Sequence, residues 1–370
     1  MRMELSGKSI ISIVFLVLIN DVLCTHFRGG TFTYKPVNPS DPANTTVIIT
    51  FRIGWRRSYS YSTFCDQSTI SSGQLTGIND YLECQDRCYG NVGSLKFRCT
   101  DFSTSEDWTI GTNSFHYTFP IPSISPRYYQ VSYQGSNWIA LVHESAAQWQ
   151  LRMYVNLTVR NDTGLMNTSP VTTMTPIVRL KFGCNHTIFI PVTDDDNDEV
   201  RCRWARGYDD CGHICGGNGI PNAWIYFREC KITYSATEYT GFYAAAVMIE
   251  DFATPTATQA LSSIPLQFLV YVFTSNEACD ERPEFTEETR AEGSCIGIPP
   301  GGTYFDRIIV RAGGPSKSIV EVTTSSPPGF IKSSVAQYAP QEYYVNVTWT
   351  PTTSQIESKL YCFTGLENSG

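Results

Sequence analysis

The sequence predicts an all-β protein built of tandem immunoglobulin-like or cadherin-like β-sandwich domains that follow a signal peptide. Short segments alternate apolar and polar residues, which is the period of a half-buried strand. Clusters of Gly, Pro, Asn and Ser separate these segments, and no segment of similar length after the signal repeats at helical spacing. With 370 residues, of which 42% are hydrophobic, the chain is long enough for two or three cores.

The amino-terminal segment 1–24 has the pattern of a secretory signal peptide. Arg2 and Lys8 precede an apolar run at 10–19, which is too short for a membrane-spanning helix of about 20 residues. Val22 and Cys24 suit the positions before a cleavage site, so we predict cleavage after Cys24, with an uncleaved membrane anchor as the alternative. We therefore expect a secreted protein, or the cell-surface ectodomain of a longer chain, with no membrane span in the mature part.

The alternating segments continue along the whole mature chain. Each carries apolar side chains at every second position, so that one face is buried and the other is solvated. These segments lie at 46–55, 149–160, 200–204, 243–249, 264–272 and 343–349.

Changes in composition divide the chain into three blocks. A stretch rich in Thr, Ser, Asn and Pro at 161–175 is predicted to be a linker, and 274–277 marks a second boundary. The predicted domains are an N-terminal β-sandwich at 25–160, a cadherin- or immunoglobulin-like β-sandwich with an acidic loop at 176–274, and an immunoglobulin-like β-sandwich at 277–370. In the last block 361–363 is expected to be the penultimate strand, so we expect this domain to be truncated.

The acidic loop at 193–200 is a candidate calcium site. Asp194, Asp196 and Asp198 stand at alternating positions, and Glu250 and Asp251 end a predicted strand whose loop could meet them. Calcium is a hard cation that takes six to eight oxygen ligands, but no EF-hand glycine or flanking helices are found here. The alternative is a turn in which the aspartate side chains cap backbone amides, with no cofactor bound.

Cysteine usage indicates an oxidising compartment. Removing Cys24 leaves twelve of the thirteen cysteines, and an even number in a secreted chain indicates disulfides. Four in the first block can close among themselves, whereas the odd numbers in the other two blocks imply an inter-block bridge or a missing partner. The twelve are Cys65, Cys84, Cys88, Cys99, Cys184, Cys202, Cys211, Cys215, Cys230, Cys279, Cys295 and Cys362.

The segment Cys211-Gly212-His213-Ile214-Cys215 has ligands that could bind zinc, although a secreted chain favours a disulfide here. Glycosylation is expected along the same export route, because the chain contains six Asn-x-Ser/Thr acceptors. These are Asn44, Asn156, Asn161, Asn167, Asn185 and Asn346. Alternation places Asn156 and Asn346 on the polar faces of their strands, where a glycan would fit.

Net charge and motifs exclude several function classes. The formal charge of −8 argues against nonspecific nucleic-acid binding, which needs a basic surface. The five histidines form no metalloprotease motif, and no nucleophile elbow or phosphate-binding loop is found. His143-Glu144 could be half of an acid–base pair, which leaves a secreted hydrolase as an alternative to a non-enzymatic protein.

Several segments resemble a family of extracellular multidomain proteins of invertebrates that is largely uncharacterised. They are THFRGG at 25–30, DDDNDEVRCRWA at 194–205, IEDF at 249–252, LSSIPLQFLV at 261–270 and VTWTP at 347–351 before Tyr361-Cys362. The resemblance implies a secreted or cell-surface protein with immunoglobulin-like or cadherin-like repeats, and no catalytic residues. A bridge from Cys295 to Cys362, across a sandwich that contains Trp349, would resemble the inter-sheet bridge of immunoglobulin-type domains.

These observations together predict a non-enzymatic adhesion, matrix or recognition protein with an extracellular protein or glycan partner. Rigid disulfide-stabilised sandwiches would present loops to that partner. The alternatives are a calcium-dependent structural ectodomain of a larger cell-surface receptor and a secreted hydrolase.

Overall fold

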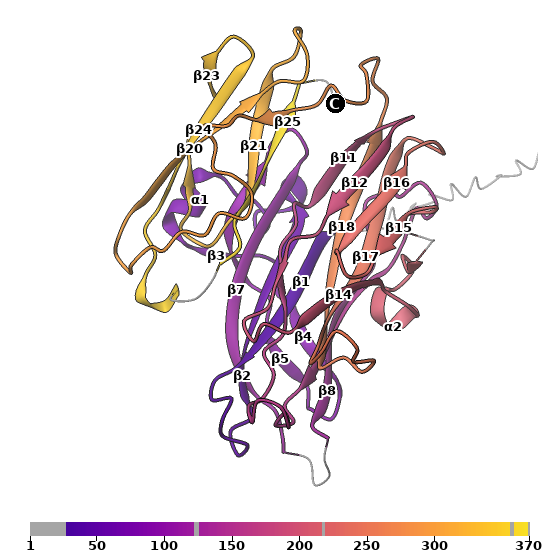
Figure 1. The fold of residues 1–370 in the computed structure, drawn as a ribbon, viewed down its shortest axis with the longest axis vertical. Helices are drawn as coiled ribbons and strands as arrows, with labels where there is room; N and C mark the ends of the chain where they lie inside the picture. Colours follow the sequence, from indigo (N-terminus) through magenta and orange to yellow (C-terminus); the bar gives the residue numbers. More distant parts are fainter. Residues whose placement is uncertain (1–26, 122–125, 217–218, 356–358, 369–370) are drawn as a thin grey trace, which may run out of the picture.

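The computed structural model describes residues 27–121, 126–216, 219–355 and 359–368, and nearly all of their regular structure is strand (Figure 1). The prediction of an all-β protein is therefore confirmed. The predicted strand at 46–55 is found as β2 (Thr46–Arg56), and that at 149–160 ends four residues early, as β9 (Trp149–Asn156). The signal peptide predicted at 1–24 lies outside the described residues.

The largest sheet draws its strands from both of the first two predicted blocks. Its strand order is β3-β6-β7-β2-β1-β18-β9-β8-β4-β5, while β11 and β17 also pair with β18, and β14 pairs with β17. The remaining strands of this sheet are β1 (Phe27–Pro36), β3 (Leu75–Thr76), β4 (Tyr81–Asp86), β5 (Asn91–Ser94), β6 (Phe97–Ser103), β7 (Trp108–Thr118), β8 (Tyr128–Gly135), β11 (Ile177–Lys181), β14 (Glu199–Trp204), β17 (Gly241–Phe252) and β18 (Ser262–Phe273).

The junction between the two blocks is the antiparallel pairing of β1 with β18. Gly29 lies opposite Phe268 in this pairing and has a φ of 111°, which favours glycine. A Cβ atom at Gly29 would lie 2.2 Å from the backbone oxygen of Gln267. The Gly-Gly pair that ends the 25–30 motif thus allows β1 to approach β18 closely.

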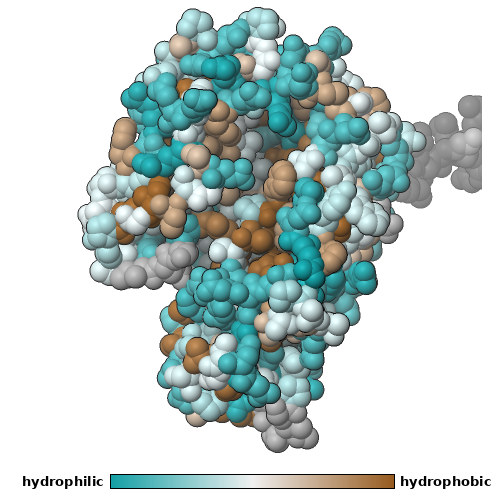
Figure 2. All heavy atoms as spheres, viewed as in Figure 1, coloured by the Kyte–Doolittle hydropathy of each residue, from teal (hydrophilic) through white to brown (hydrophobic). Residues whose placement is uncertain are grey.

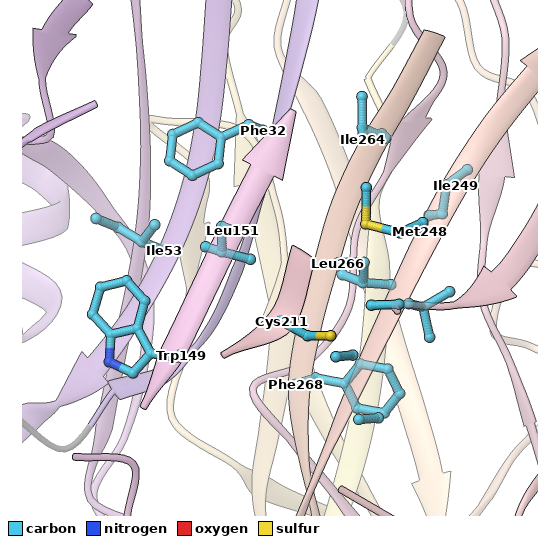
Figure 3. Close-up of a cluster of buried hydrophobic side chains, with 14 of the residues drawn as sticks. Phe32, Ile53, Trp149, Leu151, Cys211, Met248, Ile249, Ile264, Leu266 and Phe268 are labelled. Atoms are coloured by element: carbon cyan, nitrogen blue, oxygen red, sulfur yellow. The ribbon is translucent and has the colours of Figure 1, made fainter. Parts of the chain in front are cut away.

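One hydrophobic core spans both blocks. Trp149 and Leu151 from the first block lie in the same core as Met248, Leu266 and Phe268 from the second block (Figure 3). The predicted division into domains 25–160 and 176–274 therefore does not separate two cores. The physical reason is that β18 is a central strand, paired on one side with β1 and on the other with β17.

The segment 161–175 also differs from the predicted linker. Its residues 166–170 are buried against β1 and the turn that follows it. The Met166 amide donates to the Pro39 carbonyl in this turn (2.8 Å), and the Ser169 hydroxyl accepts from the Tyr34 amide in β1 (2.9 Å). Polar composition suggested an exposed connection, but these hydroxyls and amides bond to the adjacent backbone instead.

The third block forms a smaller β-sandwich with its own core. Ile308, Val345, Val347 and Trp349 are among its buried residues. One sheet has the order β19-β20-β24-β22 with β23 also on β24, and β21 pairs with β25 in the other. The strands are β19 (Glu284–Phe285), β20 (Tyr304–Arg311), β21 (Ile319–Ser325), β22 (Ile331–Lys332), β23 (Ala336–Ala339), β24 (Glu342–Trp349) and β25 (Cys362–Glu367).

Two small sheets and a few short helices complete the described structure. The first small sheet pairs β10 (Val171–Thr172) with β13 (Val192–Thr193), and the second has the order β12 (Asn185–Phe189), β16 (Lys231–Ser235), β15 (Trp224–Tyr226). The helical segments are α1 (Gln67–Ser72), α2 (Tyr208–Cys211) and the 3-10 turns η1 (Arg57–Tyr59) and η3 (Thr353–Gln355). None of these helices is long or apolar enough to cross a membrane within the described part of the chain.

Candidate functional site

A cleft of about 140 Å³ lies between the main sheet and the third block, and it is the candidate ligand site. The space-filling view shows the surface hollowed between these two parts of the molecule (Figure 2). Half of the residues that line the cleft are Ser or Thr. The hydroxyl residues are Thr31, Thr33, Thr50, Thr112, Thr168, Ser169, Thr172, Thr173, Thr193, Ser325 and Ser326.

The floor of the cleft is the polar face of β1 and β2. In their antiparallel register Thr31 pairs with Arg52 and Thr33 pairs with Thr50. Since alternate side chains of a strand point to opposite faces, the same alternation that buries Phe32 in the core places these hydroxyls toward the third block. The polar side that the sequence predicted for 46–55 thus forms part of the floor of the cleft.

Arg52 links this floor to the third block. Its guanidinium donates to the Thr100 hydroxyl (3.0 Å), to the Ser326 carbonyl (3.2 Å) and to the Thr324 carbonyl (3.5 Å). Burial lowers the pKa of Arg52 to about 10, an effect that the nearby Asp101 carboxylate opposes. The side chain still carries its charge at neutral pH, so it is a fixed positive group at the edge of the cleft.

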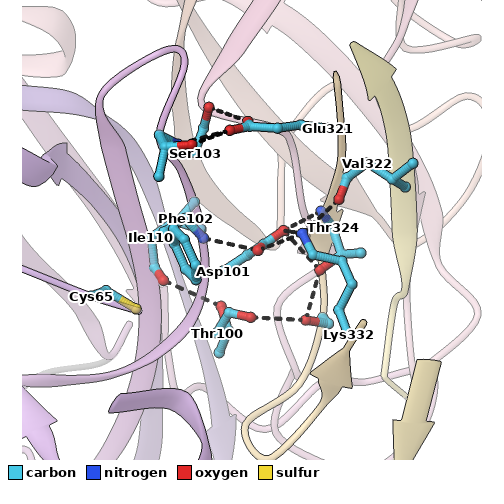
Figure 4. A network of polar contacts seen from close by, with 12 residues as sticks. Cys65, Thr100, Asp101, Phe102, Ser103, Ile110, Glu321, Val322, Thr324 and Lys332 are labelled. Carbon is cyan, nitrogen blue, oxygen red and sulfur yellow. Dashed lines mark hydrogen bonds and ion pairs between the residues drawn. The ribbon is translucent and has the colours of Figure 1, made fainter. Parts of the chain in front are cut away.

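Buried polar contacts hold the third block in place (Figure 4). The Asp101 carboxylate, which is 1% exposed, accepts from the Lys332 ammonium (2.8 Å) and from the Thr324 hydroxyl (3.0 Å). Glu321 accepts from the Thr104 amide (2.9 Å) and hydroxyl (2.7 Å). These hydrogen bonds lower the pKa of Glu321, although burial acts in the opposite direction. The cleft is therefore largely formed before any ligand binds.

A disulfide also joins the two parts. Cys184 is bonded to Cys279, and the Lys181 ammonium donates to the carbonyl of Ala278 (2.9 Å). This is the inter-block bridge that the odd cysteine counts implied. It adds a covalent restraint on the position of the third block.

The acidic loop reaches the rim of the cleft. Asp195 lines the cleft and its carboxylate lies 2.7 Å from the Lys35 ammonium, with both side chains partly exposed. Hydroxyl groups both donate and accept hydrogen bonds, and this ion pair adds one group of each charge. The arrangement suits a small polar ligand that carries many hydroxyl or amide groups.

Behind this rim, the other aspartates of the loop cap backbone amides. The Asp194 Oδ1 accepts from the amides of Asp196 (2.9 Å) and Asp198 (3.0 Å), as the capped-turn alternative requires. The second oxygen of Asp194 is buried without a hydrogen-bond partner among the described residues. Burial raises the pKa of Asp194 to about 7, and the carboxylates of Asp251, Asp198 and Asp196 raise it further.

Arg160 supplies the positive charge of this cluster. Its side chain is 5% exposed and donates to Asp198 (2.7 Å), Asp162 (2.8 Å) and Asn167 (3.0 Å). Ligand oxygens of Asp194, Asp196 and Asp198 lie within 4.8 Å of one another, as a metal site would need. However, the guanidinium already neutralises Asp198, which favours the capped turn over calcium. The sequence did not connect Arg160, Asp162 and Asn167 with the acidic loop, because they come from the segment around the predicted linker.

The two acidic residues near the end of β17 point to opposite sides of the sheet. Asp251 is fully buried behind the loop, where it accepts from the Asn167 amide (2.6 Å) and the Ser262 amide (2.6 Å). Glu250 instead accepts from Arg203 at 2.9 Å. The expectation that Glu250 joins the calcium ligands is therefore wrong, because consecutive strand residues point to opposite faces.

Four of the five disulfides in the described structure join cysteines of the same predicted block. Bonds join Cys65 to Cys99, Cys84 to Cys88, Cys202 to Cys230 and Cys211 to Cys215, in addition to Cys184–Cys279. The two thiols considered for zinc are therefore bonded to each other. The predicted Cys295–Cys362 bridge is wrong, since both are free cysteines. Cys362 lies in β25, near the buried Arg52, whereas Cys295 is exposed.

Two of the six predicted glycosylation acceptors are buried. Asn156 is 6% exposed, with its backbone amide bonded to the Tyr34 hydroxyl (3.2 Å), and Asn167 is fully buried between Arg160 and Asp251. Neither has room for a glycan in the folded protein, so these two predictions are wrong. The alternation at 149–160 correctly identified the polar side of the strand, but Tyr34 of β1 covers that side at Asn156. The other acceptors are at least partly exposed: Asn44, Asn161, Asn185 and Asn346.

His143 lies away from the cleft. Its Nε2 is 3.8 Å from the Glu238 carboxylate, and its ring contacts the rings of Tyr239 and Tyr243. Within the described residues, the neighbours of the His143 ring are thus the Glu238 carboxylate and the rings of Tyr239 and Tyr243.

Comparison with known proteins finds similarity to integrin beta-like proteins. Residues 28–158 match a family model described as integrin beta-like protein A-E, N-terminal. The chain is 23% identical to integrin beta-like protein B of Dictyostelium discoideum over 98% of its own length and 19% of the relative. Integrin beta-like protein A of the same organism is 22% identical over 65% of the chain and 12% of the relative.

The chain thus spans about a fifth or less of the length of these two relatives. The invertebrate origin implied by the resemblance is not tested by them and stays a prediction. Among solved structures, the two tandem V-type regions of a v-region-containing chitin binding protein are 13% identical, covering 69% of this chain and 88% of that one. The TM-score of 0.24 is too low for the two folds to be equated.

Proposed function

We propose that this protein is a non-enzymatic extracellular recognition protein of the adhesion type, which binds its partner in the cleft between the main sheet and the third block. The observation that supports this proposal most is a preformed cleft in which half of the lining residues are Ser or Thr. The similarity to integrin beta-like proteins and the five disulfides agree with an extracellular location.

The chemistry of the cleft favours a glycan on the partner. Sugar hydroxyls both donate and accept hydrogen bonds, and the hydroxyls of Thr33 and Thr50 on the floor of the cleft can do the same. Lys35 and Asp195 add a cation and an anion at the rim. The volume of about 140 Å³ suits the terminal part of a glycan chain rather than a folded domain.

The test is binding of the secreted full chain to a panel of immobilised glycans. The double variant Thr33→Val and Thr50→Val removes two hydroxyls while keeping the shape of the floor. At about 0.5–1.5 kcal/mol for each lost hydrogen bond, we expect binding to weaken about tenfold. Thr256→Val, at an exposed threonine outside the lining, is the matched control.

Equal binding by the double variant and the control would contradict the proposal. Binding to an unglycosylated extracellular protein that also depends on Thr33 and Thr50 would keep the site and replace the glycan by a peptide ligand.

A further inference from the structure

The outer face of the small sheet β12-β16-β15 carries three exposed aromatic side chains in two adjacent rows. Phe189, Trp224 and Tyr226 are 63%, 68% and 41% exposed. The register places them together, because Phe189 pairs with Lys231, which pairs with Tyr226, and Thr233 pairs with Trp224. The three strands lie beside one another in the ribbon view (Figure 1). Contiguous exposed apolar surface can mark a site that another molecule or group covers.

The same face also carries a glycosylation acceptor. Asn185 begins β12 on the side of Phe189, because residues two apart on a strand share a face. Thr187, the third residue of the acceptor motif, pairs with Thr233 in the row of Trp224. Trp224 is therefore two strands and one side-chain row from Asn185, within about 12 Å by strand spacing and rise.

The acceptor asparagine is held in a suitable orientation. The Ser235 hydroxyl donates to the Asn185 carbonyl oxygen at 2.5 Å, so this contact does not use the amide nitrogen to which a sugar would bond. A turn precedes Asn185, in which the Cys184 amide donates to the Lys181 carbonyl (3.4 Å) and Gly183 has a φ of 83°. That turn presents Phe182, 38% exposed, three residues before the asparagine.

We propose that an N-linked glycan on Asn185 folds back over this sheet face and packs on Trp224 and its neighbouring aromatic rings. In the attachment step Nδ2 forms a bond to C1 of a lipid-pyrophosphate-linked sugar, the pyrophosphate leaves with the C1–O electron pair, and one amide proton is released. The apolar C–H faces of the sugar rings then cover the aromatic rings, while Thr187, Thr233 and Lys231 offer polar partners to the hydroxyls. This role is separate from the ligand cleft.

The packing of Lys231 agrees with this arrangement. Its ammonium lies 4.5 Å from the centre of the Tyr226 ring and pairs with Glu229. The Lys231 ammonium is therefore held beside Tyr226. There it can bind sugar oxygens and does not block contact between the glycan and Trp224.

The test is hydroxyl-radical footprinting of the full chain secreted from eukaryotic cells, read by mass spectrometry. We expect a glycan on Asn185 and a several-fold lower oxidation of Trp224 than in the same folded protein after enzymatic removal of the glycan. Thr187→Ala should prevent glycosylation while keeping Asn185, and should raise Trp224 oxidation equally. Tyr61, which is 101% exposed, serves as the internal reference.

Asn346→Gln, which removes a predicted glycan on the third block, is the matched control and should leave Trp224 unchanged. We also expect glycan removal to lower the melting temperature by about 2–4 °C, as for a loss of about 1 kcal/mol. An unmodified Asn185, or a modified one with Trp224 oxidised as fast as without the glycan, would overturn the proposal. Either result leaves binding in the cleft unaffected, so the two proposals fail separately.

Discussion

Replacing Arg160 by Met is expected to destabilise the protein strongly. The Arg160 and Asp198 side chains are each 5% exposed, and the pair also contacts Asp162 and Asn167. Removing one partner of a buried pair leaves the other charge without compensation, which costs about 3–5 kcal/mol. We expect the lower half of that range, because Asp162 is 47% exposed and can be solvated.

Urea unfolding followed by tryptophan fluorescence measures this loss. With a slope of about 3 kcal/mol per molar urea, the midpoint should fall by about 1 M. The control is Arg311→Met, which breaks an ion pair of 2.7 Å with Glu342 where the arginine is 59% exposed, and which should cost at most about 1 kcal/mol. If Arg160→Met costs no more than this control, the buried network does not stabilise the fold as argued.

Three further outcomes follow from the same geometry. Because burial raises the pKa of Asp194 to about 7, its contribution to stability is present below pH 4 and is lost as the pH rises through 7; Asp194→Asn should flatten this dependence in melting temperature. Millimolar Ca²⁺ should raise the melting temperature of Arg160→Met but not of the wild type; a wild-type shift that Asp196→Ala abolishes would instead support the predicted calcium site. A thiol reagent should label the exposed Cys295 before the half-buried Cys362, whose pKa is raised by burial, and finding neither thiol would restore the bridge between them.

The strands were predictable because their signal is local. The alternation at 46–55 and 343–349 depends only on neighbouring residues, and β2 and β24 form there with the apolar side inward. The same rule, applied to Glu250 and Asp251, would have separated them onto opposite faces before the structure was known.

The domain division was less predictable, because it depends on pairing between distant segments. Gly29 lies opposite Phe268, so the first and second blocks share a sheet through residues more than two hundred positions apart. Composition at 161–175 indicated a linker, but Asn167 and Ser169 make buried hydrogen bonds to Asp251 and Tyr34. Composition alone does not distinguish a polar residue that is solvated from one that makes hydrogen bonds in the protein interior.

The sequence by itself determined an all-β chain with its strand segments, its acidic turn and its closely spaced cysteines, because each of these depends on residues close together in the chain. Only the tertiary structure decided which blocks share a core, that Arg160 meets Asp198, and that hydroxyls of β1 and β2 face the third block across a cleft. Those features arise from contacts whose free energy is gained only after distant segments have been brought together, and no local pattern records them.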